Sequence, residues 1–128
     1  MISVDLFTVV SIAACLQAKH FLADGPLQTK TMVADKGIYG ARLGIVHSSL
    51  HAIGTGLVFA FFKFNVVLVV SLLILDGVIH YHVDYSKENV VKRAGWGTGD
   101  APFWWALSAD QMLHQLTYLG LVCLAFTI

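Results

Sequence analysis

Long apolar runs alternate with short polar segments along the chain, and these runs have the length of membrane-spanning helices. The twenty residues between Arg42 and Lys63 and the eighteen residues 111–128 contain no aspartate, glutamate, lysine or arginine. A helix needs about 20 apolar residues to cross the ~30 Å hydrocarbon core of a bilayer. Two further apolar runs, 6–18 and 64–75, continue into segments that contain acidic residues and histidines. The pattern predicts four transmembrane helices, over about residues 3–24, 41–62, 66–90 and 103–127.

The segments between the runs contain residues that interrupt helices. Gly25 and Pro26 end the first predicted helix, residues 63–65 form a tight connection, and residues 94–102 form a glycine-rich loop. Residues 27–39 have room for a short interfacial helix. The valine-rich run 66–75 is also compatible with a buried strand, but an isolated strand in lipid leaves its backbone unpaired, so we favour a helix there.

Composition supports a single integral membrane domain over residues 1–128. Hydrophobic residues make up 57% of the chain and charged residues 12%, whereas about 25% charged residues is usual for soluble domains. The formal net charge is zero, so the chain lacks the basic excess that binds nucleic acid, and we expect no nucleic-acid partner. Cys15 and Cys123 lie in apolar runs, without the spacing of a zinc or redox motif.

The basic residues predict the orientation of the helices in the membrane. Seven of the eight lysines and arginines lie in or beside the loops that follow the first and third predicted helices. Because basic loops stay in the cytoplasm, we expect those two loops to be cytoplasmic. Both termini are then on the outer, periplasmic side of a bacterial inner membrane.

Histidines and aspartates recur four positions apart, and every predicted helix carries one such set. Residues four apart lie on one face of a helix, and the rise of 1.5 Å per residue puts the sets at a similar depth. We therefore predict an all-α, four-helix transmembrane bundle with a polar His/Asp cluster in its cytoplasmic half. The nine residues are His20, Asp24, His47, His51, Asp76, His80, Asp84, Asp110 and His114.

The cost of burying these aspartates predicts bound metal. A lone carboxylate at the centre of a bilayer costs about 2.5–3.5 kcal/mol or more, and neighbouring carboxylates repel one another. Lys19 and Lys87 lie next to loops, where their long side chains can reach water. Two divalent ions would balance the four aspartates, and neutral imidazoles would add nitrogen ligands. We predict that all nine residues ligate two ions of zinc, manganese or iron; the alternatives are a proton relay and an interhelical polar clamp.

Chemical roles follow from the positions within the cluster. Asp84 and Asp76 are predicted to bridge or ligate the ions, and one carboxylate of the cluster could instead act as general base. Lys87, three residues beyond Asp84, could stabilise developing negative charge. His82 is expected outside the site, because it lies on the opposite helix face from His80, and Tyr118 is expected to pack in the interior.

Four ordered motifs run along the chain: Lys19-His-Phe-Leu-Ala-Asp-Gly-Pro-Leu-Gln-Thr, His47-xxx-His51, His80-xxx-Asp84-xx-Lys87 and Asp110-Gln-Met-Leu-His114. They resemble the motifs of a family of small polytopic membrane proteins of unknown function, found in bacteria and tailed phages. The resemblance covers nearly the whole chain. The motifs are also loosely similar to those of membrane-bound metal-dependent hydrolases, which share helices rich in histidine and aspartate.

Three functions are compatible with this pattern. The first is a dinuclear metal-dependent hydrolase that acts on a phospholipid or a lipid-linked phosphoester at the cytoplasmic leaflet. The second is a redox enzyme with di-iron; haem is less suitable, because the cluster holds more carboxylate than haem needs. The third is non-enzymatic: an ion or proton pathway, or a membrane interaction protein. Membrane lipids are the expected partners, and glycine-rich helix faces would allow a homo-oligomer.

Overall fold

The chain folds into helices connected by short turns and loops. The computed structural model describes residues 4–128 and contains five helices in that range. They are α1 (Leu6–Asp24), α2 (Lys30–Lys36), α3 (Arg42–Phe61), α4 (Val66–Ala94) and α5 (Ala101–Thr127). The predicted all-α class is confirmed, and residues 66–75, for which a strand was the alternative, are helical.

Local sequence explains where the helices begin and end. The side chains of Asp5, Thr29 and Asn65 accept hydrogen bonds from backbone N–H groups in the first turns of α1, α2 and α4, which satisfies donors that otherwise have no partner. Pro102 lies in the first turn of α5, where its missing N–H costs nothing. Gly95 ends α4 with φ 69°, in the left-handed region that glycine adopts without strain.

The predicted count of four helices in the bundle is not matched. Five helices are present in residues 4–128, and one of them, α2, lies in the segment 27–39 where a short helix was expected. Three of the helices described, α1, α3 and α4, are long and apolar enough to cross a membrane by length and composition. The 27-residue α5 is long enough as well, but Asp110, Gln111, His114 and Gln115 lower the hydropathy of its middle.

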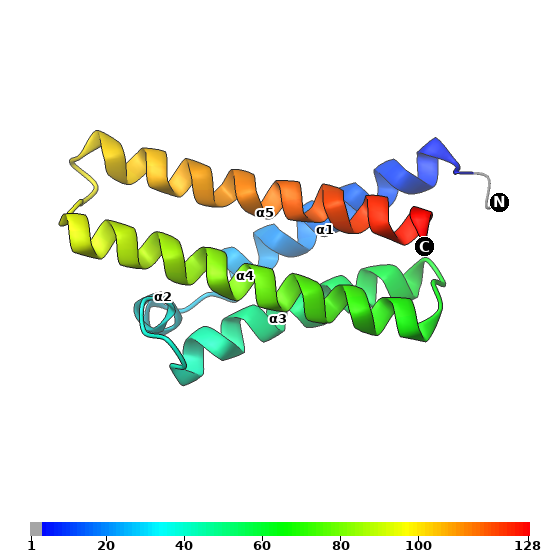
Figure 1. Ribbon diagram of the computed structural model, residues 1–128, viewed down its shortest axis with the longest axis horizontal. Coiled ribbons are helices and arrows are strands. Elements are labelled where there is room, and N and C mark those ends of the chain that lie inside the picture. The colour runs from blue at the N-terminus through cyan, green and yellow to red at the C-terminus, as the bar shows by residue number, and fades with distance from the viewer. Residues whose placement is uncertain (1–3) are drawn as a thin grey trace.

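The helices run back and forth, so the two ends of the molecule differ (Figure 1). The start of α1, the α3–α4 turn and the end of α5 lie at one end, which we call the terminal end. Helix α2 and the α4–α5 loop lie at the other, which we call the loop end. Helix α4 packs against both α3 and α5, and α1 packs against α3 and α5. The short α2 lies across α3 and also contacts α4.

Polar and apolar side chains are distributed in the opposite way to a water-soluble protein. His47, His51 and His80 are fully buried, whereas Phe7 and Phe61 are each 78% exposed. Large exposed apolar side chains occur on all four long helices. Monomeric soluble proteins rarely expose so much apolar surface, whereas a lipid environment requires it. The chain therefore has the surface of a membrane protein.

The interior has an apolar part and a polar part. A cluster that includes Ile12, Phe59 and Leu121 fills the bundle toward the terminal end, and the histidines and aspartates fill it toward the loop end. Helices α3 and α4 approach closely, because a Cβ atom added to Gly77 would lie 3.0 Å from Ala52 Cβ. Gly77, which lies in a predicted glycine-rich face, is thus used in packing within one chain. The predicted homo-oligomer stays a prediction.

Candidate metal centre

Each of the four long helices turns its histidine and aspartate set toward the interior of the bundle. Members of a set stand one helical turn apart, so they meet the same neighbouring helices. Eight of the nine predicted residues are buried, and Asp24, at the end of α1, is partly exposed. The predicted His/Asp cluster is therefore present.

One group of possible metal ligands joins α1, α3 and α4. It consists of Asp24, His47, His51 and His80, whose potential ligand atoms lie within 4.8 Å of one another. Asp24 Oδ1 is 3.1 Å from His47 Nε2 and 2.9 Å from His51 Nε2. His47 Nε2 is in turn 3.3 Å from His80 Nε2. Two imidazoles thus contact one carboxylate oxygen, and a third contacts one of those imidazoles.

A second group joins α4 and α5 and shares His80 with the first. Its members are His80, Asp84 and His114. His114 Nε2 lies 3.2 Å from Asp84 Oδ1, and His80 Nε2 lies 3.2 Å from Asp84 Oδ2. Asp110 Oδ1 is 3.4 Å from His114 Nε2 and borders this group. Because His80 offers one Nε2 atom, it can ligate an ion in only one of the two groups.

These separations fit the requirements of a metal ion. Nitrogen and oxygen ligands at about 2.0–2.1 Å from a tetrahedral ion lie about 3.3 Å from one another. The closest contacts between donor atoms, 2.9–3.3 Å, are near that edge length, and all donors of each group lie within 4.8 Å of one another. The donor set of imidazole and carboxylate is the one that zinc, manganese and iron prefer.

Two buried oxygen atoms without hydrogen-bond partners also indicate a cation site. Within residues 4–128, Asp84 Oδ2 and Asp110 Oδ1 are buried and have no hydrogen-bond partner. Asp84 Oδ2 lies near His80, His47 and Lys36 without hydrogen-bond geometry to any of them. Buried oxygens of this kind are rare in proteins unless a water or ion binds them. The cluster therefore accommodates a cation chemically and geometrically.

His51 has contacts on both ring nitrogens. Lys19 Nζ lies 3.4 Å from His51 Nδ1 and donates to the His51 carbonyl oxygen at 3.1 Å. When Lys19 donates to Nδ1, the neutral ring carries its proton on Nε2 and donates it to Asp24 Oδ1. In that state His51 orients Asp24. The predicted role of His51 as a ligand requires the contact from Lys19 to Nδ1 to be released.

His20 and Tyr118 form a buried contact between α1 and α5. His20 Nδ1 lies 2.7 Å from Tyr118 Oη, and His20 Nε2 lies 3.0 Å from Gln111 Oε1 and 3.1 Å from Asp24 Oδ2. In the described chain His20 belongs to neither ligand group. When the Tyr118 hydroxyl donates to Nδ1, His20 donates from Nε2 and positions Asp24 and Gln111. The expectation that Tyr118 packs in the interior is met, since it is 1% exposed, but its hydroxyl also contacts the cluster.

Asp76 lies deeper in the bundle and is bound by other partners. Its Oδ2 atom accepts hydrogen bonds from Lys19 Nζ at 2.8 Å and from Thr55 Oγ1 at 2.6 Å. Among the described residues, neither ligand group includes Asp76. The expectation that Lys19 reaches water was wrong, because its side chain is 10% exposed and the ion pair with Asp76 holds it inside.

Lys36 is a member of the cluster that sequence reasoning missed. It lies at the end of α2, is 6% exposed and places Nζ 3.0 Å from Asp84 Oδ2. Nζ also donates to Gln28 Oε1 at 2.6 Å. Lys36 does not lie four positions from another polar cluster residue, and it enters the site because α2 folds back over the loop end. The four-residue spacing of histidines and aspartates therefore could not predict that Lys36 belongs to the cluster.

The buried lysines change the charge balance of the cluster. Lys19 and Lys36 offset two of the four aspartates, Asp76 and Asp84. With neutral imidazoles, the remaining charge is two negative units, contributed by Asp24 and Asp110. A single divalent ion balances that charge. The charge argument for two ions did not count Lys19 and Lys36 as partners of the aspartates, and two bound ions stay a prediction.

Two small cavities border the cluster. One of about 260 Å³ is lined by Asp24, Lys36, Lys87 and Asp110, among others. A second, of about 340 Å³, is lined by His20, Asp24 and other residues. Lys87 forms an ion pair with Glu88 and lines the first cavity, beside Asp110. His82 lies outside the cluster, as expected, and its ring contacts Tyr39.

Apolar helices around a buried His/Asp cluster are compatible with a membrane metalloprotein. A family model described as "Protein of unknown function (DUF3307)" matches residues 12–127, so the chain belongs to this family. No curated protein and no solved structure matches the chain. Because the family description assigns no activity, any conclusion about function rests on the chemistry of the cluster.

Proposed function

We propose that this chain is an integral membrane metalloprotein whose ion is held by Asp24, His47 and His80. The observation that carries the proposal is the convergence of these donors inside helices that expose apolar side chains. His47 Nε2 lies 3.1 Å from Asp24 Oδ1 and 3.3 Å from His80 Nε2, and all three donors lie within 4.8 Å of one another. Three protein ligands leave a coordination position open, as in catalytic metal sites. His51, Lys19 and His20 orient the ligands.

Helix α5 is proposed to be a fourth crossing. It contacts α4 and turns Asp110, His114 and Tyr118 inward, so lipid would meet its apolar residues. The positive-inside rule then places the loop end in the cytoplasm and both termini outside, in a bacterial inner membrane. The metal cluster would lie in the cytoplasmic half.

A second ion would bind Asp84 and His114. It would have to displace Lys36, whose ammonium lies 3.0 Å from Asp84 Oδ2. Charge balance therefore favours one ion per chain in the resting protein. A dinuclear form is reached when Lys36 moves away or is replaced.

The proposed reaction is hydrolysis of a phosphoester at the membrane surface. A bound ion would polarise a phosphoryl oxygen and lower the pKa of a ligated water. Asp110 Oδ1, which is buried and has no hydrogen-bond partner in residues 4–128, is placed to accept the proton of the attacking water. Lys87 lines the same cavity and would offset negative charge on the phosphoryl group. Water adds to phosphorus, the ester P–O bond breaks, and the leaving alkoxide takes up a proton.

Metal content is the first test. The protein is purified with a tag that contains no histidine and without chelator, and the metal per chain is measured by elemental analysis. We expect about one divalent ion in the wild type and a loss in His47→Ala and Asp24→Asn. His82→Ala is the matched control and should retain the ion. A folded wild type that stays metal-free after incubation with zinc, manganese and ferrous ions would refute the proposal.

The number of ions and the reaction are tested on the same preparation. Lys36→Met should raise the content toward two ions, because Asp84 loses its ammonium partner. Lipid phosphoesters in nanodiscs should be hydrolysed by the loaded protein, and Asp110→Asn should stop turnover while keeping the metal. Intact lipids after prolonged incubation would exclude the hydrolase and leave a binding or ion-conducting role.

A redox function is the second candidate, and one geometric observation favours it. Two sets of two histidines and one aspartate can be drawn from the cluster, and such triads bind iron in oxygen-activating proteins. Haem is disfavoured, because the rings of His51 and His80 stack with their centroids 3.6 Å apart. An oxo-bridge absorption band after addition of ferrous iron and oxygen would favour redox chemistry over hydrolysis.

A further inference from the structure

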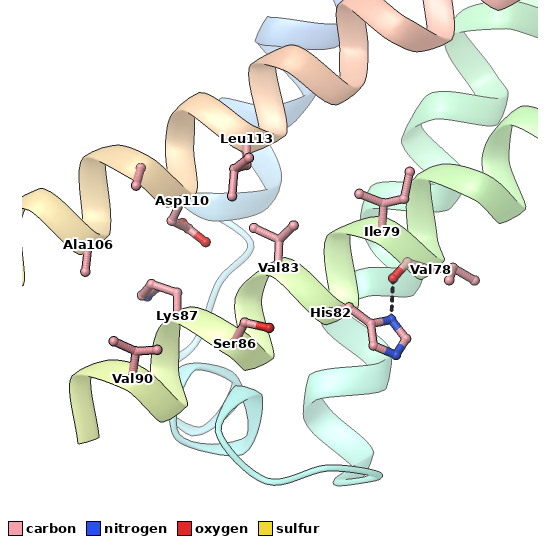
Figure 2. Close-up of a pocket in the computed structure, with 11 residues that line it drawn as sticks. Val78, Ile79, His82, Val83, Ser86, Lys87, Val90, Ala106, Asp110 and Leu113 are labelled. Atoms are coloured by element: carbon pink, nitrogen blue, oxygen red, sulfur yellow. Dashed lines mark hydrogen bonds between the residues drawn. The ribbon is translucent and has the colours of Figure 1, made fainter. Parts of the chain in front are cut away.

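An apolar groove runs along the outer side of α4 and α5 (Figure 2). It has a volume of about 580 Å³, and its lining includes Val78, Val83, Val90, Ala109 and Leu113. Figure 2 shows Val83 and Leu113 projecting into the space between the two helices. Because α4 is long and apolar enough to span a membrane, the groove would face hydrocarbon.

The groove and the polar cavity beside the metal cluster share part of their lining. Lys87 and Asp110 line both spaces. Asp110 is 4% exposed, and its Oδ1 atom has no hydrogen-bond partner among residues 4–128. The same oxygen lies 3.4 Å from His114 Nε2. The apolar groove thus adjoins Asp110, which borders the candidate metal ligands.

The dimensions of the groove suit one acyl chain. Its lining on α4 extends from Val78 to Val90, which is about 18 Å along a helix. Half of the hydrocarbon core of a bilayer is about 15 Å thick. An acyl chain in the groove would therefore lie along one leaflet, with its head group near Lys87 and Asp110.

We propose that this groove is the lateral access route for a lipid with an anionic phosphate head group, whose chain lies between α4 and α5 and whose phosphate contacts Lys87. The inference rests on the proposed function, because it makes this lipid the substrate of the metal site. Apolar contacts alone would not select a ligand here, since lipid tails are as apolar as the groove. Selection comes from the head group.

Charge in the polar cavity makes head-group binding depend on metal. Its ionisable lining consists of two lysines and three carboxylates: Lys36, Lys87, Asp24, Glu88 and Asp110. Because Lys36 is paired with Asp84, the other four groups leave the cavity negative by two units, which opposes a phosphate. A divalent ion on Asp24 cancels this charge. The loaded protein should therefore bind the anionic lipid, and the metal-free protein should not.

A second groove provides an internal control. It has a volume of about 450 Å³, lies between α3 and α4, and is lined by Ser49, Ala52 and Ile74, among others. Its lining contains none of the lysines or aspartates described above. Lipid tails that enter it would meet no anchor for a phosphate.

The test is photo-crosslinking in nanodiscs of phosphatidylcholine that contain a small fraction of phosphatidylglycerol with a diazirine in its acyl chain. We expect labelling of zinc-loaded protein within residues 78–90 and 106–113. Unlabelled phosphatidylglycerol should compete, whereas added phosphatidylcholine and inorganic phosphate should not. Chelation of zinc should remove the competable labelling.

Variants separate the groove from its head-group anchor. Ala109→Trp should fill the groove and abolish competable labelling, and Ser49→Trp in the second groove is the matched control with wild-type labelling. Lys87→Gln should lower the preference for phosphatidylglycerol by roughly tenfold, as expected when a hydrogen bond to a charged group is lost. Metal content is measured for every variant.

Two results overturn the inference, and they differ from failure of the proposed function. In the first, the protein binds zinc in full, but its labelling is the same before and after chelation; this result refutes only the selection of lipid by the site. Competable labelling that survives in Ala109→Trp refutes this groove as the route. A protein that binds no metal refutes both the proposed function and the inference.

Discussion

Replacing Lys19 by methionine should destabilise the bundle strongly. Lys19 Nζ lies 2.8 Å from Asp76 Oδ2, and the two side chains are 10% and 1% exposed. At this distance the gross attraction is about 6 kcal/mol with an effective dielectric constant of 20. Removing one partner leaves a buried, uncompensated carboxylate, which typically costs about 3–5 kcal/mol. We expect Lys19→Met to lower the free energy of unfolding by that amount.

The double variant Lys19→Met/Asp76→Leu isolates the cause. Without either charge, the site becomes apolar, and stability should return to within about 1–2 kcal/mol of the wild type. Thr55 loses its acceptor in Asp76 but can donate to a backbone carbonyl one helical turn earlier. Recovery in the double variant would show that the unpaired charge, and not lost packing around Lys19, destabilises the single variant.

The assay is unfolding by sodium dodecyl sulfate in mild detergent, followed by the fluorescence of the three tryptophans. Chelator is added to every sample, so that metal binding does not contribute to stability. A loss of less than about 1 kcal/mol in Lys19→Met would refute the reasoning. A double variant that is no more stable than the single variant would refute it as well.

Three further changes test other parts of the structure. Tyr118→Phe removes the 2.7 Å contact to His20 Nδ1. It should weaken metal affinity by about 10-fold or more at unchanged stoichiometry, measured by competition with a chelator. Unaltered affinity would contradict the role of Tyr118 in positioning His20. Metal affinity should fall as the pH drops below about 6.5, because imidazole ligands must be neutral to bind. Zinc release, measured with a fluorescent indicator, should take up more than one proton per ion. A metal affinity that stays constant from pH 8 to 5 would argue against histidine ligands. Gly77→Leu should cost about 1–3 kcal/mol, because Ala52 Cβ lies 3.0 Å from the added Cβ, whereas Gly120→Leu, with open space around its Cβ, should be nearly neutral in the same unfolding assay.

Periodicity in the sequence was sufficient to predict the helices and most of the cluster. Apolar runs of about 20 residues predict helices because lipid leaves no other partner for the backbone. The four-residue spacing of Asp76, His80 and Asp84 puts all three on one side of α4, and all three are buried. The depth argument also held, since the sets meet in one half of the bundle. These properties depend on distances within a single helix, so the sequence alone contains them.

The tertiary structure decided which of these residues meet and what neutralises them. Asp76 lies with Lys19 and Thr55, outside both groups of possible ligands in the described chain. Lys36 reaches Asp84 because α2 folds back across α3 and α4, which lowers the number of ions that charge balance requires. The groove between α4 and α5 depends on how those helices diverge. Packing between segments distant in sequence sets the rotation of each helix about its axis and the path of each connecting loop. These features therefore cannot be predicted from the spacing of residues within one segment.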